Sequence, residues 1–328
     1  MVSLKKNDSL PSQNQGKIAK ELKLFKKSLV KNWELYLLLI PAFLYFIIFH
    51  YWPLYGVQIA FRDFNPVDGF FGSPWVGLQH FTRFFNSFAF ERVVRNTLAI
   101  SFLQLAIGFP IPIILALMLE ELLFRRFKRV LQMVTYAPHF ISVVVLVGMM
   151  FNMFSVRTGI VNYILEWIGF ERIHFFAEPS WFRTLFVGSS IWQSAGWGSI
   201  IFIAAIAGVD QELYEAARID GANKLKRIMK VTLPCIVPTI IILLILQIGQ
   251  IMNVSFQRAL LMQNPQNISV SEVISTYVYK VGLRGGDGIA GGQFSFSTAI
   301  DLFNSVINFT LLLSANTIVK KYSEHSLF

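Results

Sequence analysis

Several long apolar stretches of this chain carry amide and indole side chains at helical spacing. Gln247, Gln250 and Asn253 follow one another at three-residue intervals, and Asn304 and Asn308 are four residues apart. Residues three or four apart share a helix face. Amides form hydrogen bonds and indole rings offer flat apolar surfaces, which suits a polyhydroxylated ligand such as a sugar. The residues that we predict for a solute path are Trp192, Gln193, Trp197, Gln247, Gln250, Asn253, Asp301, Asn304 and Asn308.

Each of these side chains also has a simpler role open to it. An amide inside an apolar helix can bond to a neighbouring helix, which is typically worth about 0.6–2 kcal/mol, and this alternative stays open for all of them. Asp301 is the one carboxylate inside a predicted apolar stretch. A charge in mid-bilayer costs roughly 2.5–3.5 kcal/mol, so we expect Asp301 to face water, a partner or the path. A carboxylate there would repel an anionic solute.

The ionisable residues form no recognisable catalytic motif. No histidine pair has the HExxH spacing, and the single cysteine, Cys235, excludes an intrachain disulfide and a Cys-only metal site. The GxxxxGK[ST] pattern that holds ATP phosphates is missing as well. We therefore predict no catalytic residue, no metal site and no cofactor bound by this chain. An intramembrane enzyme is the alternative from another class of function, and it would be active without ATP or partners.

The apolar residues are gathered into blocks long enough to cross a membrane. The chain is 54% hydrophobic and 15% charged, whereas soluble proteins are about 25% charged. Blocks of about 20 apolar residues match the bilayer core, where the backbone must be helical because no water can satisfy it. We predict an all-α, polytopic membrane protein, with kinks where prolines fall inside its helices. The six expected spans are residues 35–61, 97–119, 130–154, 182–209, 231–254 and 294–319.

The positive charges predict the orientation of these spans. With the N-terminus inside the cell, 19 Lys and Arg residues fall on the cytoplasmic side and 10 on the other. Cytoplasmic loops are enriched in these residues, so both termini are predicted to lie in the cytoplasm. The net charge of +10 is then an orientation signal with attraction to membrane lipid, and nucleic-acid binding is not expected.

The loop between the fourth and fifth spans, residues 210–234, has the pattern of a helix, a glycine and a second helix. Asp210 is a good N-cap, and Gly221 suits the left-handed residue that ends a helix. A second helix can begin at Ala222 and carries a cluster of basic residues. An ordinary connector is the alternative for this elbow. The residues that share one face of its first helix are Leu213, Ala216, Ala217 and Asp220.

The elbow resembles the EAA motif of permease subunits of binding-protein-dependent ABC importers. The resemblance implies the type I importer fold and a coupling helix that docks in a groove of a separate ATP-hydrolysing subunit. In that role we expect Glu215, Ala216, Ala217, Asp220, Gly221 and Ala222. The matching positions are Glu215, Ala216, Ala217, Asp220, Gly221, Ala222, Leu233, Pro234 and Pro238.

Other segments resemble the permeases for complex oligosaccharides, some of which import acidic oligosaccharides from alginate or pectin. These segments are 50–61, 75–81 (with His80 where Asn is commoner), 96–97 and 302–309. The resemblance implies a cytoplasmic basic tail (1–32), a first span with an external loop (33–91), a permease core (92–319) with the elbow at 210–234, and a cytoplasmic C-terminal tail (320–328).

The resemblance also implies a place in the inner membrane of a bacterial cell, and it implies partners. They are a second permease, which we expect to be a different chain, two ATP-binding subunits that hold ATP and Mg, and an external solute-binding protein. The same architecture could carry a peptide or a polyol, since the elbow does not distinguish solutes. A third class of function is a purely structural membrane subunit. Such a subunit would lose nothing when Glu215 or Gly221 is altered.

Overall fold

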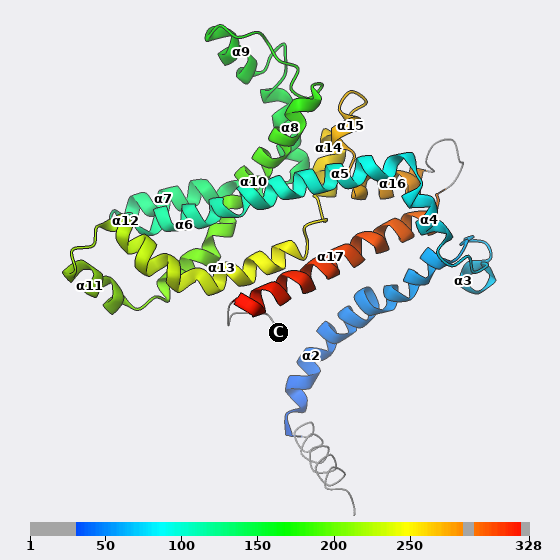
Figure 1. Ribbon diagram of the computed structural model, residues 1–328, viewed down its shortest axis with the longest axis horizontal. Helices are drawn as coiled ribbons and strands as arrows, with labels where there is room; N and C mark the ends of the chain where they lie inside the picture. The colour runs from blue at the N-terminus through cyan, green and yellow to red at the C-terminus, as the bar shows by residue number, and fades with distance from the viewer. Residues whose placement is uncertain (1–30, 285–291, 323–328) are drawn as a thin grey trace, which may run out of the picture. The chain divides into compact units, whose positions relative to one another are not determined.

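The computed structural model describes residues 31–284 and 292–322 (Figure 1). Regular structure within these residues is helical, apart from an isolated bridge between Arg62 and Trp75. The predicted all-α class is therefore confirmed. Most of the basic tail, the Gly-rich segment 285–291 and the last residues of the C-terminal tail lie outside the described residues.

The chain divides into two units, residues 1–58 and 59–328. The described part of the first unit is helical. It begins with α2 (Trp33–Phe46) and η1 (Ile47–Tyr51), and the helix continues into η2 (Trp52–Phe61). The whole run, Trp33–Phe61, is long and apolar enough to cross a membrane, which agrees with the first predicted span.

The second unit holds four further helices of that kind among its described residues. They correspond to the second, fourth, fifth and sixth predicted spans. The second is α5 (Phe88–Leu103), η3 (Gln104–Gly108) and α6 (Pro110–Glu120); the fourth is α10 (Pro179–Ala207); the fifth is α12 (Lys224–Arg227), η5 (Ile228–Thr232) and α13 (Leu233–Ile248); the sixth is α17 (Phe294–Tyr322).

The third predicted span is not one straight helix. It consists of α7 (Arg125–Tyr136), η4 (Ala137–Phe140) and α8 (Val143–Met153), and the pair is bent by 101°. Pro138 lies in the tight turn η4, where it cannot donate a backbone hydrogen bond. Ser142 then caps α8 by accepting a hydrogen bond from the backbone N–H of Val145 at 3.3 Å. One helix therefore ends and the next begins within five residues, which explains the bend of the third span.

Other prolines widen their helices without breaking them. The π-turns η1, η3 and η5 each end two residues before a proline: Pro53, Pro110 and Pro234. A proline ring clashes with the carbonyl four residues earlier, and a π-turn moves that carbonyl away by taking in one extra residue. The expected kinks at Pro110 and Pro234 are thus widened turns within continuous spans.

α10 is the central helix of the second unit, and Figure 1 shows it beside α6 and α7. Gly196 permits this approach, since a Cβ there would lie 1.9 Å from the carbonyl oxygen of Thr135 in α7. Apolar side chains form a cluster between α6, α10 and α13, including Phe202, Ile206 and Ile236. A second cluster joins α10 to α8 and α14 (Phe256–Met262). A third cluster joins α5 to α4 (Gln79–Phe85), α16 (Ile274–Arg284) and α17.

Short helices occupy the connections between these elements. They are α3 (Gly69–Gly72), α9 (Ile160–Trp167), α11 (Gln211–Ile219) and α15 (Ile268–Ser271). Of these, α11 lies in the predicted elbow. Figure 1 shows it at the end of the second unit where α6 and α12 also lie.

Candidate functional site: the elbow and the central cavities

The first helix of the elbow is fixed by local backbone chemistry. The Asp210 carboxylate accepts a hydrogen bond from the backbone N–H of Glu212 at 3.0 Å, which caps α11. Gly221 has a φ of 73°, in the region that favours glycine. The N–H of Ala222 donates to the carbonyl of Ala217 at 2.9 Å, as in a Schellman ending. The cap and the glycine ending are both as predicted.

The second helix of the elbow begins later than expected. Asn223 caps it by accepting from the N–H of Lys226 at 2.9 Å, so α12 starts at Lys224 and not at Ala222. It runs without a break through η5 into α13. The elbow is therefore joined directly to the fifth span.

The elbow helix α11 has an inner and an outer face. Tyr214 on the inner face packs against the cluster of Phe202, Ile206 and Ile236, and its hydroxyl lies 3.0 Å from Oγ1 of Thr232. On the outer face Ile219 is 87% exposed.

The predicted docking residues divide between exposed and partly covered positions. Glu215, Ala216, Asp220 and Gly221 are exposed, whereas Ala217 and Ala222 are half-buried. Sequence reasoning missed Tyr214 as the anchor and Ile219 as the most exposed apolar side chain of this helix. The spacing of Gln211, Tyr214 and Arg218, at i, i+3 and i+7, was the available signal for an inner face.

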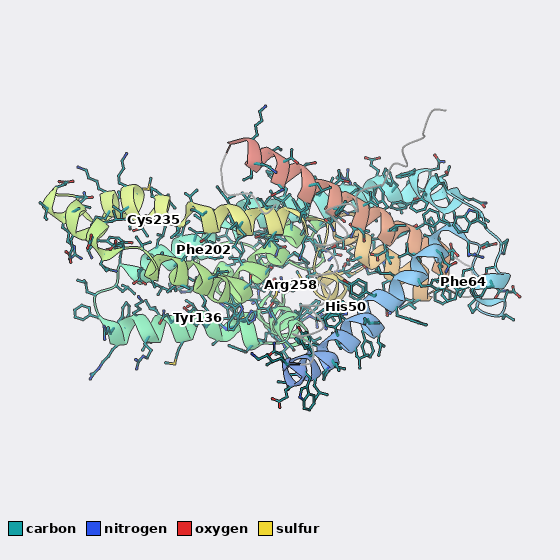
Figure 2. All side chains as sticks on the ribbon, turned by 90° about the horizontal axis from the view of Figure 1, so that it is seen from below. His50, Phe64, Tyr136, Phe202, Cys235 and Arg258 are labelled. Carbon is teal, nitrogen blue, oxygen red and sulfur yellow. The ribbon has the colours of Figure 1, made fainter. Side chains whose placement is uncertain are left out.

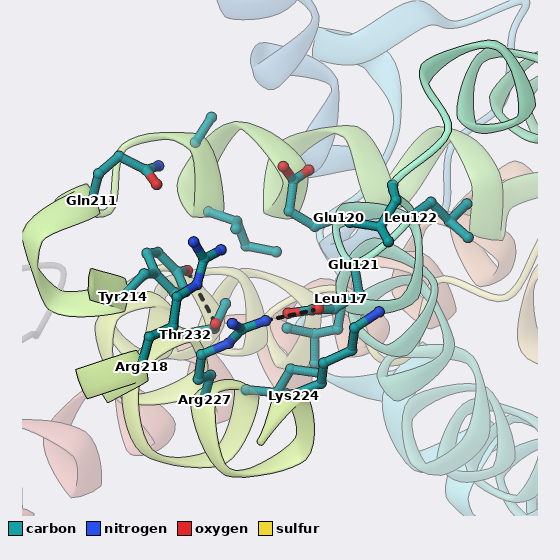
Figure 3. Close-up of a pocket in the computed structure, with 14 residues that line it drawn as sticks. Leu117, Glu120, Glu121, Leu122, Gln211, Tyr214, Arg218, Lys224, Arg227 and Thr232 are labelled. Atoms are coloured by element: carbon teal, nitrogen blue, oxygen red, sulfur yellow. Dashed lines mark hydrogen bonds and ion pairs between the residues drawn. The ribbon is translucent and has the colours of Figure 1, made fainter. Parts of the chain in front are cut away.

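One ion pair joins the elbow to α6, and a second joins α6 to α7. Arg227 donates to Glu121 at the end of α6 at 3.4 Å (Figure 3), and Lys128 of α7 donates to Glu120 at 2.7 Å. Together with the packing of Tyr214 against the apolar cluster, the Arg227–Glu121 pair fixes the elbow to the ends of α6 and α10.

Two adjoining cavities lie between the second, fourth and fifth spans. One, of about 450 Å³, is lined by Gln247, Gln250 and Asn253 of the predicted set. The other, of about 310 Å³, is lined by Trp197, and Gln104 and Gln247 border both. The structure thus brings four of the nine predicted path residues to these cavities. Gln104 was missed, although it is a polar residue within the second predicted span.

Three asparagines of the predicted path form a cluster of their own. Nδ2 of Asn304 and Nδ2 of Asn308 both donate to Oδ1 of Asn253, at 3.2 and 3.0 Å. Oδ1 of Asn308 accepts from the backbone N–H of Met252 at 3.0 Å. Asn304 and Asn308 are buried. These two amides therefore join α17 to the segment after α13, which is the simpler role left open by the sequence.

Gln193 is also engaged in helix packing. Its Nε2 donates to the carbonyl of Ile141, at the bend of the third span, at 2.6 Å, and its Oε1 accepts from Nη2 of Arg258 in α14. Arg258 (Figure 2) is 4% exposed and its guanidinium lies 5.6 Å from the centre of the Phe186 ring. Burial lowers the pKa of Arg258 to about 10, so it is a cation at neutral pH. No pattern of residue types or spacing had singled out Arg258.

The remaining predicted residues have different environments. Trp197 stacks on His139 with ring centroids 4.6 Å apart and planes 4° apart. Trp192 is exposed and lines neither cavity. Asp301 is exposed on α17, and its carboxylate has no ion-pair partner within the part of the chain that the structure describes. Within residues 31–284 and 292–322, no group of three or more His, Cys, Asp or Glu side chains could hold a metal ion.

Comparison with known proteins agrees with this architecture. The chain is 46% identical to protein LplB of Bacillus subtilis over 90% of this chain and 91% of that protein. It is 41% identical to YteP of the same organism, a polygalacturonan/rhamnogalacturonan transport system permease, over 92% of each chain.

Solved structures of transporter chains also resemble this chain. One chain of a bacterial ABC transporter involved in the import of the acidic polysaccharide alginate superposes with a TM-score of 0.82. It is 39% identical, and the match covers 91% of this chain and 99% of the other. Residues 108–323 match the family described as "Binding-protein-dependent transport system inner membrane component". The chain is therefore a multi-pass membrane protein that belongs to the family of binding-protein-dependent transport system inner membrane components.

Proposed function

We propose that this chain is a permease subunit of an ATP-driven importer that passes an oligosaccharide from an external solute-binding protein into the cytoplasm. The observation that carries the proposal is the pair of cavities bordered by Gln104, Gln247, Gln250 and Asn253, with the Trp197 indole in one wall. Amides along a shaped wall with an aromatic face suit the hydroxyls and the apolar ring faces of sugars.

An acidic oligosaccharide is the solute class that we propose. The similar structures belong to an alginate importer, and one is in complex with a periplasmic protein that carries an alginate pentasaccharide. YteP is named for polygalacturonan and rhamnogalacturonan. Alginate and polygalacturonan are both polymers of sugar acids, so the relatives that support this proposal share one solute chemistry.

The importer would contain this chain, a second and different permease, two ATP-binding subunits that hold ATP and Mg, and the solute-binding protein. The elbow would face the cytoplasm, as the distribution of Lys and Arg predicts, and both termini would lie on that side. Glu215, Ala216, Ala217, Asp220, Gly221 and Ala222 would form the surface that docks on an ATP-binding subunit. The chain itself would hydrolyse no ATP.

The transport step would be a switch between two states. ATP binding would draw the ATP-binding subunits together and move the elbow, and the continuous helix from α12 to α13 would carry that movement to the cavities. The loaded binding protein and ATP must both favour the outward-facing state, because a ligand shifts an equilibrium only by its differential affinity.

The test is substrate-dependent ATP hydrolysis and uptake by the assembled importer in proteoliposomes. Oligouronates should stimulate both, whereas neutral oligosaccharides, peptides and polyols should not. A Gln247→Ala/Gln250→Ala double variant should lower oligouronate uptake about tenfold, since each lost hydrogen bond is worth roughly 0.5–1.5 kcal/mol. A Ser305→Ala variant, on the exposed side of α17, is the control. Stimulation by a peptide or polyol alone would contradict the proposal.

A further inference from the structure

A cavity of about 190 Å³ lies between the elbow and the ends of α6 and α10 (Figure 3). It is separate from the two central cavities and shares no lining residue with them. Arg218 of α11 and Lys224 and Arg227 of α12 line it from the elbow, and Glu120 and Glu121 line it from α6. The solute path has no use for this cavity, because it lies at the far end of α13 from Gln247 and Gln250.

The charges that line this cavity are not balanced. Glu120 is paired with Lys128 and Glu121 with Arg227. Within the described residues Arg218 and Lys224 have no ion-pair partner, and Nε of Arg227 is buried without a hydrogen-bond partner. Guanidinium and ammonium donors that converge without enough carboxylates suit a phosphate group, whose oxygens accept several charge-assisted hydrogen bonds.

The apolar part of the cavity and its surroundings favour a lipid over a soluble anion. Leu117, Ile206 and Ile228 form part of the wall. The adjoining loop exposes large apolar side chains, and Leu123 is 81% exposed. Basic residues follow directly in α7, at Arg125 and Arg126. A polar headgroup site beside exposed apolar side chains and a basic helix is typical of a site for anionic phospholipid at the cytoplasmic leaflet.

The cavity also lies on the side of the elbow that is turned away from its docking surface. Gln211, Tyr214 and Arg218 line the cavity, whereas Ala216, a predicted docking residue on the opposite face of α11, is exposed and does not line it. A ligand here would therefore not compete with an ATP-binding subunit. It would bridge α11 and α12 to the end of α6.

We infer that this cavity binds the phosphate of an anionic phospholipid headgroup, held by Arg218, Lys224 and Arg227, and that the bound lipid clamps the elbow to the bundle. The inference uses the cytoplasmic orientation of the elbow proposed above and is independent of the transported solute. Lipid binding can be measured without transport, so a failure here is distinguishable from a failure of the proposed function.

The experiment is native mass spectrometry of the purified full-length chain, titrated with phosphatidylglycerol against a background of phosphatidylcholine. The wild type should retain phosphatidylglycerol selectively. An Arg218→Gln/Lys224→Gln variant should bind it about tenfold more weakly, because it replaces charge-assisted hydrogen bonds to the phosphate by weaker neutral ones. The charge-preserving variant Arg218→Lys/Lys224→Arg should retain binding, and thermal unfolding of each variant checks its fold.

The matched control is Lys226→Gln/Lys230→Gln, which removes the same charge from exposed positions in the same loop that do not line the cavity. It should bind phosphatidylglycerol within about twofold of the wild type, because these two ammonium groups do not line the cavity and no charge-assisted bond to the phosphate is lost. An equal loss in both double variants would reduce the effect to general surface charge and overturn the site. No loss in either would overturn it as well. Displacement of the lipid by inorganic phosphate alone would overturn the lipid as the ligand.

Discussion

The elbow and the asparagine cluster are both polar parts of an apolar protein, but they are built in opposite ways. The two ends of the elbow helix α11 are held in shape by bonds between residues two to five positions apart, such as Asp210 to Glu212 and Ala222 to Ala217. The asparagine cluster is held by bonds between residues 51 to 56 positions apart, from Asn253 and Met252 to α17. The elbow therefore keeps its form while its outer face stays exposed, whereas the cluster exists only when the helices are packed.

This difference separates function from stability. A change in the elbow should alter the communication with the proposed ATP-binding subunits while the bundle remains folded. A change in the cluster should loosen the bundle itself, because it removes contacts between helices that are distant in sequence. Three substitutions test this comparison.

The largest effect is expected for Gly221→Val. A Cβ at this position meets nothing within 4 Å, but the φ of 73° strains any β-branched residue, at a cost of roughly 1–2 kcal/mol. We expect coupled uptake by the assembled importer to fall about tenfold, with the ratio of ATP hydrolysed to solute imported rising. The chain should still insert, and because fraying of the last turn of α11 relieves the strain locally, the bundle should unfold near the temperature of the wild type.

Gly221→Asn is the matched control, since asparagine tolerates the left-handed region far better than valine. It should retain most of the coupled uptake. If the asparagine and valine variants behaved alike, the left-handed ending would not be the important feature of the elbow.

A smaller effect is expected for Asn308→Ala, and it should appear as lost stability. The substitution removes the bond to Asn253 and leaves the N–H of Met252 without its acceptor. We expect a loss of about 1–2 kcal/mol in the free energy of unfolding in detergent. Ser305→Ala, on an exposed position of the same helix, should change stability little. Normal stability with lost uptake would instead make Asn308 a solute contact.

The smallest effect is expected for Asp210→Ala. Loss of the cap should cost about 1 kcal/mol of helix stability, confined to the first turn of α11. Hydrogen exchange at the backbone amide of Glu212 should quicken, while amides of α13 should be unchanged. Asp210→Ser restores a capping oxygen and should restore protection. A general increase of exchange along α13 would show that the elbow is not an independent unit.

The fold was largely predictable because its signals are local or compositional. Apolar blocks located five of the six spans, and Asp210 and Gly221 marked the start and end of α11. A kink at Pro138 in the third span was predicted, but its size of 101° was not, since Pro138 and Pro110 look alike in sequence. The two prolines differ in their neighbouring turns, because the serine cap at 142 starts a new helix after Pro138, whereas the widened turn η3 keeps the helix continuous at Pro110.

The site was predictable only in part, because an amide in an apolar helix has the same spacing whether it faces a cavity or a neighbour. Gln247 and Gln250 border a cavity, but Gln193 and Asn308 are committed to other helices. Which outcome applies depends on tertiary packing. Arg258 and Tyr214 were missed for the same reason, since their importance comes from partners far away in the chain. The predicted domain boundaries and docking residues stay predictions.

The widened turn before Pro234 keeps the fifth span continuous, so that it can move as a single lever. Residues 224–248 form one helix of 25 residues, and at 1.5 Å per residue it is about 37 Å long. A tilt of about 10° about one end of such a rod displaces the other end by about 6 Å. The elbow is attached to one end, and Gln247 lies near the other. Were this helix jointed like the third span, the same push would be absorbed at the hinge and the cavity wall would stay still.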